Sequence, residues 1–246
     1  MREREIVLEV TGLEKAYPSF KLEKVGFTVA KGEIVGFVGR NGAGKSTTLK
    51  SILGLVHPDA GGVSFFGLDF AEHQREIRQR IGFAAGAVDY YKRKRIRELG
   101  DVTKSFYDVW DEDAWNRYLR EFELDAAKRP AELSEGMKVK LNLALALSHR
   151  AELLILDEPT SGLDPFSRAE LLDVFRKLAG DGTAILYSTH IISDLEKCAD
   201  RILYIRRGRI ADEADTADFL EKYRTEEDKT LEDVMIRLEK EGTDRA

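Results

Sequence analysis

The chain has 246 residues, of which 43% are hydrophobic and 34% are charged, and its net charge is −6. This balance is typical of a globular protein with a substantial core, and the acidic sum argues against a chain that wraps nucleic acid. The longest apolar runs, such as Leu153 to Leu156, fall far short of the roughly 18 residues that a membrane span needs. No apolar segment typical of a signal peptide follows the charged start MRERE, and the single cysteine, Cys198, excludes an intramolecular disulfide framework. We therefore expect a protein of the reducing cytosol.

The first elements are predicted to be antiparallel strands. Ile6, Leu8 and Val10 alternate with their neighbours, and residues 22–29 form a second strand-like run. Tyr17 and the proline after it mark the turn between the two strands.

A glycine-rich loop, Gly39 to Ser46, organises the chain. Its sequence GRNGAGKS fits G-x-x-x-x-G-K-[ST], follows the apolar run 34–38 and precedes a helix-compatible segment, 47–53. Backbone N–H groups of such a loop and the positive end of the helix behind it are typical of phosphate binding, although an isolated glycine-rich turn can also bind nothing. Lys45 would reach the outer phosphates, and the Ser46 hydroxyl would bind Mg²⁺, a hard ion that prefers oxygen ligands.

The middle of the chain changes from strands to helices. A short strand at 63–66, a polar helix at 72–80 and a strand at 81–85 are predicted first. From Gly86 to Arg150 no strand-like run appears, and we predict helices at 102–110, 113–122 and 137–147. The last of these alternates like a strand, but its Leu, Ala and Lys residues are strong helix formers and align at i,i+4, so a helix is favoured.

The remaining elements alternate again between strand and helix. We predict strands at 153–156 and 184–187, helices at 165–179 and 191–199, a hairpin turned at Arg207-Gly208, and a weakly helical tail from Asp215 onwards. No internal repeat is found, so one phosphate site per chain is expected.

A pair of carboxylates follows the apolar run LLIL. Asp157 and Glu158 stand at the carboxyl end of a predicted strand, where ligands bind in open α/β sheets. Asp157 would hold Mg²⁺ or one of its waters, and Glu158 would polarise a water for attack on a γ-phosphate. An isolated pair of this kind would be interpreted as a helix cap or a surface pair; the phosphate loop in the same chain favours the functional reading.

Three further motifs bear on the phosphate loop. In LSEGM, residues 133–137, Ser134 and the N–H groups around Gly136 form another possible phosphate site at a helix start, although a serine there is usually only a cap. The tight loop SGLD ends at Asp164. After Ser188 and Thr189, the imidazole of His190 would contact a γ-phosphate, although a lone histidine at a strand end is more often structural.

Taken together, residues 6–212 resemble the ATP-binding subunit of an ABC transporter. In that comparison GRNGAGKS looks like the Walker A loop, LLILDE like the Walker B strand with its catalytic glutamate, and LSEGM like the family signature, which is more often LSGGQ. SGLD is similar to the D-loop, His190 stands where the switch histidine belongs, and Tyr17 matches the aromatic residue on which adenine stacks. The resemblance implies that Glu158 and His190 are catalytic, that Ser46 and Asp157 bind Mg²⁺, and that the nucleotide is bound by Tyr17, Gly39, Arg40, Asn41, Gly42, Ala43, Gly44, Lys45, Ser46, Thr47, Ser134, Gly136 and Asp164.

The resemblance also implies a fold and an assembly. The fold would be an α/β P-loop NTPase with a mixed or parallel core sheet at 1–86 and 150–212, an N-terminal antiparallel part, a helical subdomain at 87–149 and a helical tail at 213–246. Two subunits, identical or paralogous, would bind two Mg·ATP head to tail, with Ser134 of one touching the ATP held by Lys45 of the other. The dimer would drive a separately encoded membrane permease and lie at the cytoplasmic face of the membrane; no nucleic-acid partner is expected.

Two features depart from this pattern or leave its interpretation open. Gly86 stands where the family usually carries glutamine, so a water or Asp89 would have to supply the missing oxygen, and Met137 replaces the signature glutamine. The basic run Lys92 to Arg97 is either a solvated face, a docking site for acidic permease loops or lipid headgroups, or, least favoured, a nucleic-acid contact.

Two other functions remain open at this point. One is a soluble ABC-type ATPase that acts on nucleic acid, ribosomes or cofactor assembly, and the other is a regulator that binds ATP without turnover. The presence of both Glu158 and His190 disfavours the regulator.

Overall fold

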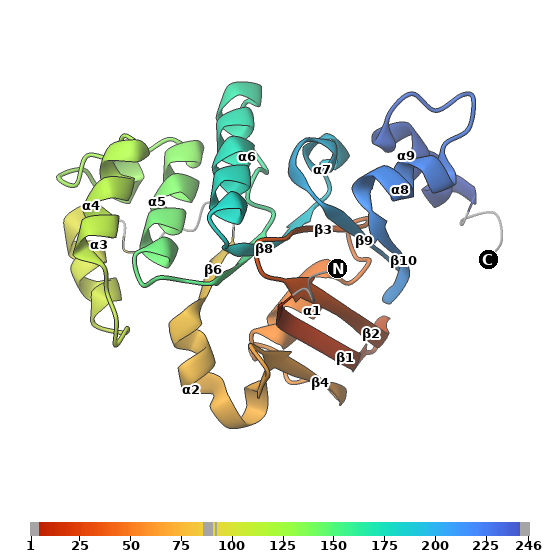
Figure 1. The fold of residues 1–246 in the computed structure, drawn as a ribbon, viewed down its shortest axis with the longest axis horizontal. Helices are drawn as coiled ribbons and strands as arrows, with labels where there is room; N and C mark the ends of the chain where they lie inside the picture. Colours follow the sequence, from red (N-terminus) through yellow and green to blue (C-terminus); the bar gives the residue numbers. More distant parts are fainter. Residues whose placement is uncertain (1–4, 86–90, 92, 242–246) are drawn as a thin grey trace.

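The computed structural model describes residues 5–85, 91 and 93–241. Its described strands form two sheets (Figure 1): an antiparallel sheet in the order β2-β1-β4-β5 and a mixed sheet in the order β10-β9-β3-β8-β7-β6. The expected α/β class and the antiparallel opening are confirmed. The strand bounds are β1 Ile6–Tyr17, β2 Phe20–Ala30, β3 Ile34–Val38, β4 Ala60–Phe65, β5 Leu68–Asp69, β6 Ile81–Ala85, β7 Leu153–Asp157, β8 Ala184–Thr189, β9 Arg201–Arg206 and β10 Arg209–Asp215.

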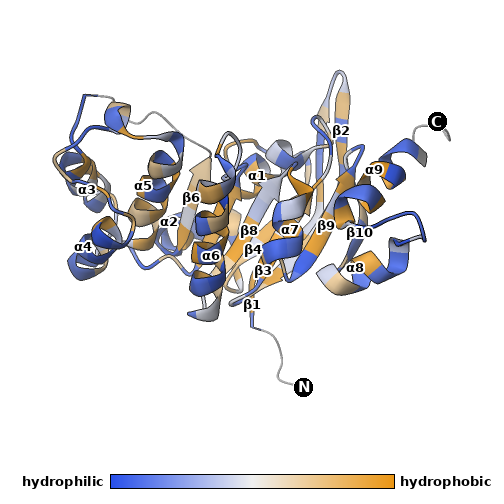
Figure 2. Ribbon diagram, turned by 90° about the horizontal axis from the view of Figure 1, so that it is seen from above, coloured by the Kyte–Doolittle hydropathy of each residue, from blue (hydrophilic) through white to orange (hydrophobic). Residues whose placement is uncertain are grey.

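The centre of the mixed sheet is apolar and buried. All five residues of β3 and all six of β8 are buried, as expected for parallel strands covered by helices on their faces, and Figure 2 shows hydrophobic ribbon in this central sheet. β3, β8 and β7 run parallel, with Val38 opposite Thr189 and Asp157 opposite Ser188. Their carboxyl ends therefore meet at one edge of the sheet, where ligands bind in folds of this kind.

Arg201, the cation of a buried ion pair, joins the two sheets. Arg201 at the start of β9 donates to Glu33 (Nε to Oε1, 2.8 Å) and to the carbonyl of Thr28 on β2 (2.6 Å). Both charged side chains are nearly inaccessible, so loss of either partner would leave an uncompensated buried charge. This contact fixes β2 against the edge of the core.

The helices surround this framework. In Figure 1, α3, α4 and α5 form a lobe at one end of the molecule, and α8 and α9 lie at the other. The bounds are α1 Lys45–Ile52, α2 Phe70–Arg80, α3 Ile96–Lys104, α4 Glu112–Glu121, α5 Glu135–Leu147, α6 Pro165–Gly180, α7 Ile192–Cys198, α8 Thr216–Tyr223 and α9 Leu231–Glu241, with a short 3₁₀ turn at Pro130–Glu132.

The strand-like alternation near the middle of the chain belongs to a helix, as composition favoured. α5 packs against α4 on one side and β6 on another, and seven consecutive residues from Leu141 to Leu147 are buried. A helix buried on several faces shows no clean 3.6-residue pattern, which explains the ambiguous sequence.

The helix expected at 102–110 is wrong. α3 instead runs from Ile96 to Lys104 and closes at Ser105, whose hydroxyl donates to the carbonyl of Val102 (2.6 Å). The following residues cross to α4, and the Tyr107 ring stacks on His149 with centroids 3.7 Å apart. This long-range aromatic contact outweighs the weak local helix propensity.

The tail is an integral part of the core. Leu231, Val234 and Met235 are almost fully buried and α9 packs against α7, whereas the sequence indicated only weak helicity. Residues at i, i+3 and i+4 share one helix face, so these three side chains form a continuous apolar stripe.

Candidate nucleotide site

The phosphate loop leaves β3 and enters α1 at Lys45. Gly42 and Gly44 have φ angles of 83° and 118°, which side-chain-bearing residues rarely adopt, and a Cβ at Gly44 would lie 2.9 Å from the Phe20 ring. Gly44 is also the N-cap of α1, so no side chain caps this helix, and its first turn carries no acidic residue. The N–H groups at this helix start therefore fit a bound phosphate.

The side chain of Lys45 lies deep beside the loop. It is 6% exposed, and its ammonium donates to the carbonyl of Gly39 (2.6 Å) and lies 3.7 Å from Glu158 Oε1. A buried ammonium needs such partners because desolvation is costly. A phosphate in the loop would meet this charge directly.

Glu158 is held in a strained position at the mouth of the loop. Its φ angle is +52°, and its carboxylate Oε2 lies 2.7 Å from His190 Nδ1 and accepts from the backbone N–H of His190 (3.3 Å). Non-glycine residues in this conformation persist only where the surroundings fix them, and such residues cluster at functional sites. The two predicted catalytic side chains are thus in direct contact and next to Lys45.

These residues line one cleft. Its volume is about 420 Å³, within the roughly 300–1,000 Å³ usual for ligand sites. Most of the predicted Walker A residues belong to it, and sequence reasoning missed Phe20, whose signal was only its place just after the Tyr17 turn. The lining residues are Phe20, Arg40, Asn41, Gly42, Gly44, Lys45, Ser46, Thr47, Glu158 and His190.

Asp157 is not among the residues that line the cleft, and its side chain is held by Ser188, a residue to which the sequence prediction gave no role. The hydroxyl of Ser188 on β8 donates to Asp157 Oδ1 (2.5 Å). Ser188 is paired with Asp157 across β7 and β8. A single sequence does not reveal this register, so it offered no signal for the contact.

The signature and D-loop residues do not line this cleft. Ser134 is the N-cap of α5 and accepts from the N–H of Met137 (3.3 Å), with Gly136 in the first helical turn. Asp164 caps α6 by accepting from two backbone N–H groups and from the Ser167 hydroxyl (2.6 Å), and these hydrogen bonds lower the pKa of its carboxyl. Both motifs therefore stand at helix starts outside the cleft of their own chain.

Tyr17, the predicted adenine-stacking residue, is not part of the cleft lining. It ends β1 and is 41% exposed. Gly86 and Asp89, the residues in question at the usual glutamine position, lie outside the described residues.

Neither a membrane span nor a dense metal-ligand cluster is found in the described parts of the chain. No helix there is both long and apolar enough to cross a bilayer, and no three His, Cys, Asp or Glu side chains group as a metal site. Mg²⁺ does not require such a cluster, because it is commonly held by one or two carboxylates, waters and substrate phosphates.

Residues 22–161 match the model of the ABC transporter family. The chain belongs to the ABC transporter family. It is 36% identical over 211 residues to the bacitracin transport ATP-binding protein BcrA of Bacillus licheniformis, covering 84% of this chain and 69% of that protein. It is 40% identical over 188 residues to the Nod factor export ATP-binding protein I of Burkholderia lata, covering 74% of this chain and 62% of that protein.

Solved structures agree with this assignment. An ATP-binding subunit of an ABC transporter superposes with a TM-score of 0.83 at 31% identity, covering 94% of this chain and 99% of the other. A second cassette, the ADP conformation of MJ1267, has a TM-score of 0.78 at 22% identity and supports the fold alone. The protein is thus an ATP-binding ABC ATPase subunit of a transporter, as the motifs predicted.

Proposed function

We propose that ATP hydrolysis takes place in the cleft between the phosphate loop and Glu158, with Glu158 as general base and His190 orienting it. The observation that carries this proposal is the contact between Glu158 and His190 beside the Lys45 ammonium. The carboxylate would accept a proton from the attacking water, and Lys45 would offset the charge on the outer phosphates. Because Glu158 occupies one imidazole nitrogen, the other is the one available to a γ-phosphate.

The oxygen donors near the loop fit Mg²⁺. Ser46 lines the cleft, and Asp157 is hydrogen-bonded to the neighbouring strand through Ser188. A hard cation prefers such ligands and, when bound, would neutralise charge on the phosphates. We assign Ser46 and Asp157 to the ion, and Tyr17 to the adenine.

We further propose that two subunits, identical or paralogous, close head to tail around the nucleotide. Residues 87–149 would act as a helical subdomain that presents Ser134 and Gly136 to the other copy, with Asp164 nearby. This accounts for a phosphate-type helix end that is not part of its own chain's cleft.

A mixing experiment tests this arrangement. Lys45→Ala disables the loop, and Ser134→Arg blocks the signature at an exposed position. Each variant alone should be inactive, whereas an equimolar mixture should form heterodimers with one intact site and recover about a quarter of wild-type hydrolysis if the two sites are independent. ATP-dependent heterodimers should also appear by size-exclusion chromatography. A mixture with neither activity nor dimers beyond those of the separate variants would contradict the head-to-tail site.

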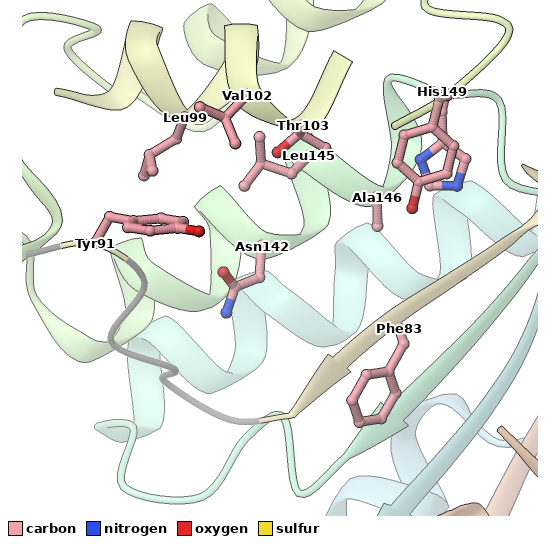
Figure 3. Close-up of a pocket in the computed structure, with 10 residues that line it drawn as sticks. Phe83, Tyr91, Leu99, Val102, Thr103, Asn142, Leu145, Ala146 and His149 are labelled. Atoms are coloured by element: carbon pink, nitrogen blue, oxygen red, sulfur yellow. The ribbon is translucent and has the colours of Figure 1, made fainter. Parts of the chain in front are cut away.

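The partner that we propose is an integral membrane permease, with this subunit peripheral to the cytoplasmic face. A pocket beside β6 is lined by α3 and α5 (Figure 3), and Phe83 and Tyr91 at its rim are 37% and 62% exposed. The exposed Arg93 and Arg95 follow Tyr91 in the chain and immediately precede α3. An apolar pocket flanked by cations suits an apolar permease segment with acidic ends.

Charge reversal at residues 92–95 tests the docking surface. Assembly with the permease in membranes should fall, because the electrostatic complementarity is lost, while soluble ATPase activity should stay unchanged. Co-purification from membranes measures assembly. Unchanged assembly would indicate that the basic run is only a solvated face and not a docking surface.

A further inference from the structure

Ser188 bridges the two carboxylate residues that the proposed mechanism uses. Its side chain is fully buried at the end of β8, and its hydroxyl donates to Asp157 Oδ1 (2.5 Å). The same oxygen accepts from the backbone N–H of Glu158 (3.2 Å). One hydroxyl therefore contacts the side chain of one residue and the backbone of the next.

The two contacts of Ser188 fix the orientation of the Asp157 carboxylate and the backbone conformation of Glu158. The hydrogen bond to Oδ1 selects one orientation of the Asp157 carboxylate; the hydrogen bonds found among the described residues leave Oδ2 without a donor. The N–H of Glu158 is shared between the hydroxyl and the carbonyl of Ser188 (3.1 Å), at the residue whose φ angle is +52°. Backbone in this conformation holds only where its surroundings overdetermine it.

The geometry points to Ser188 as a positioning residue for hydrolysis: it sets the orientation of the Asp157 carboxylate, which would hold Mg²⁺, and it fixes the backbone of Glu158, whose side chain lies beside Lys45 and His190. This inference rests on the proposed roles of Asp157 and Glu158. Because residues that hydrogen-bond a metal ligand tune the ligand's affinity, the hydroxyl should affect Mg²⁺ use more than nucleotide binding itself.

The decisive measurement is the Mg²⁺ concentration for half-maximal binding of a fluorescent ATP analogue, made in a Glu158→Gln background so that turnover does not interfere. Ser188→Ala should raise it roughly 10-fold, within the 10- to 100-fold range for residues behind a metal ligand. Binding of the analogue in EDTA should be unchanged. With Glu158 intact, Ser188→Ala should lower kcat roughly 10-fold with little change in KM for ATP.

Two comparisons make the result specific. Ser148→Ala removes another fully buried serine hydroxyl, one that donates to the carbonyl of Ala144 in the helical lobe (2.6 Å), and should leave the Mg²⁺ requirement unchanged. Ser188→Thr keeps the hydroxyl and should restore most of the Mg²⁺ response. If the threonine variant does not fold, Ser188→Cys, with its weaker donor of similar size, should fall between Ser and Ala.

Asp157→Asn separates failure of this inference from failure of the proposed function. If Asp157→Asn raises the Mg²⁺ requirement and folded Ser188→Ala does not, Ser188 is structural and the inference is overturned while the proposed site stands. If neither variant changes the requirement, the metal role of Asp157 is overturned, and the inference with it.

Discussion

Two helix starts in this protein carry sequences typical of phosphate binding, and they differ in what accepts from their backbone N–H groups. α1 begins at Lys45 behind Gly44, without a side-chain cap or an acidic residue in its first turn. α5 begins behind Ser134, whose oxygen accepts from the N–H of Met137, and carries Glu135 in its first turn. The first start leaves its donors for an anion, whereas the second already uses side chains of its own.

The difference indicates which site is preformed. The α1 end lies in a cleft with Lys45, Glu158 and His190 around it, so a phosphate has a place within one chain. The α5 end lies on the lobe, and Lys138 partly neutralises Glu135 (Nζ to Oε1, 2.7 Å). We infer that nucleotide binds first at the α1 end and that the α5 end engages only when a second subunit arrives.

The largest expected effect comes from Glu158→Gln. Loss of the base should slow hydrolysis about 10²- to 10⁴-fold, while binding at the α1 end persists and the α5 end is trapped on nucleotide as an ATP-bound dimer. Turnover assays and light scattering measure the two effects. Glu152→Gln, which affects only an ion pair with Arg80, is the matched control. Unchanged turnover would contradict the role of Glu158 as general base. If the variant stays a monomer in ATP, the proposal that the α5 end binds nucleotide in a dimer is contradicted.

A smaller effect, confined to the α1 end, is expected for Tyr17→Ala. Loss of base stacking should weaken ATP affinity by about 1–3 kcal/mol, without changing affinity for tripolyphosphate, which has no base. Phe20→Ala is the informative companion, because Phe20 lies in the cleft beside Gly44. Equilibrium binding of ATP and of tripolyphosphate to each variant distinguishes the two residues. A loss for Phe20→Ala alone would transfer the stacking role to Phe20.

Ser134→Ala should affect the α5 end alone. Hydrolysis by the dimer should fall roughly tenfold, the lower end of the range for one hydrogen bond to a charged group, while ATP affinity of the single chain is unchanged. Loss of the cap should also lower stability by about 0.5–2 kcal/mol. Asp69→Ala removes the cap of α2 and should reproduce the stability loss without the catalytic one. Equal hydrolysis in both variants would reduce Ser134 to a cap.

The smallest effect is expected for Glu135→Gln. An anion in the first turn of α5 opposes an incoming phosphate, so its removal should tighten the ATP-bound dimer by about 0.3–1 kcal/mol. Glu170→Gln also removes an exposed carboxylate paired with a lysine, Lys140, and should have no such effect. Sedimentation over a concentration series measures the dimer affinity. A weaker dimer would show that Glu135 stabilises the start of α5 more than it repels the phosphate.

Local pattern was enough to predict most of the framework. The strand at 81–85 has the predicted bounds, the hairpin turns at Arg207-Gly208, and the helix behind the phosphate loop begins two residues earlier than predicted. The helix predicted at 102–110 was wrong, and the tail, although helical as predicted, was not expected to be buried, because both outcomes depend on the contacts of Tyr107 with His149 and of α9 with α7. Side chains far apart in sequence make both contacts.

The sequence by itself determined the glycine loop, the alternation of strands and helices, and the family, because each depends on residue types at short spacing. Only the tertiary structure decided that Glu158 reaches both Lys45 and His190, that Phe20 faces the loop, and that Ser188 contacts the Asp157 carboxylate and the Glu158 backbone. The physical reason is register. Parallel strands bring Asp157 and Ser188 together across 31 positions of chain, and that pairing is set by how whole elements pack, which no local pattern encodes.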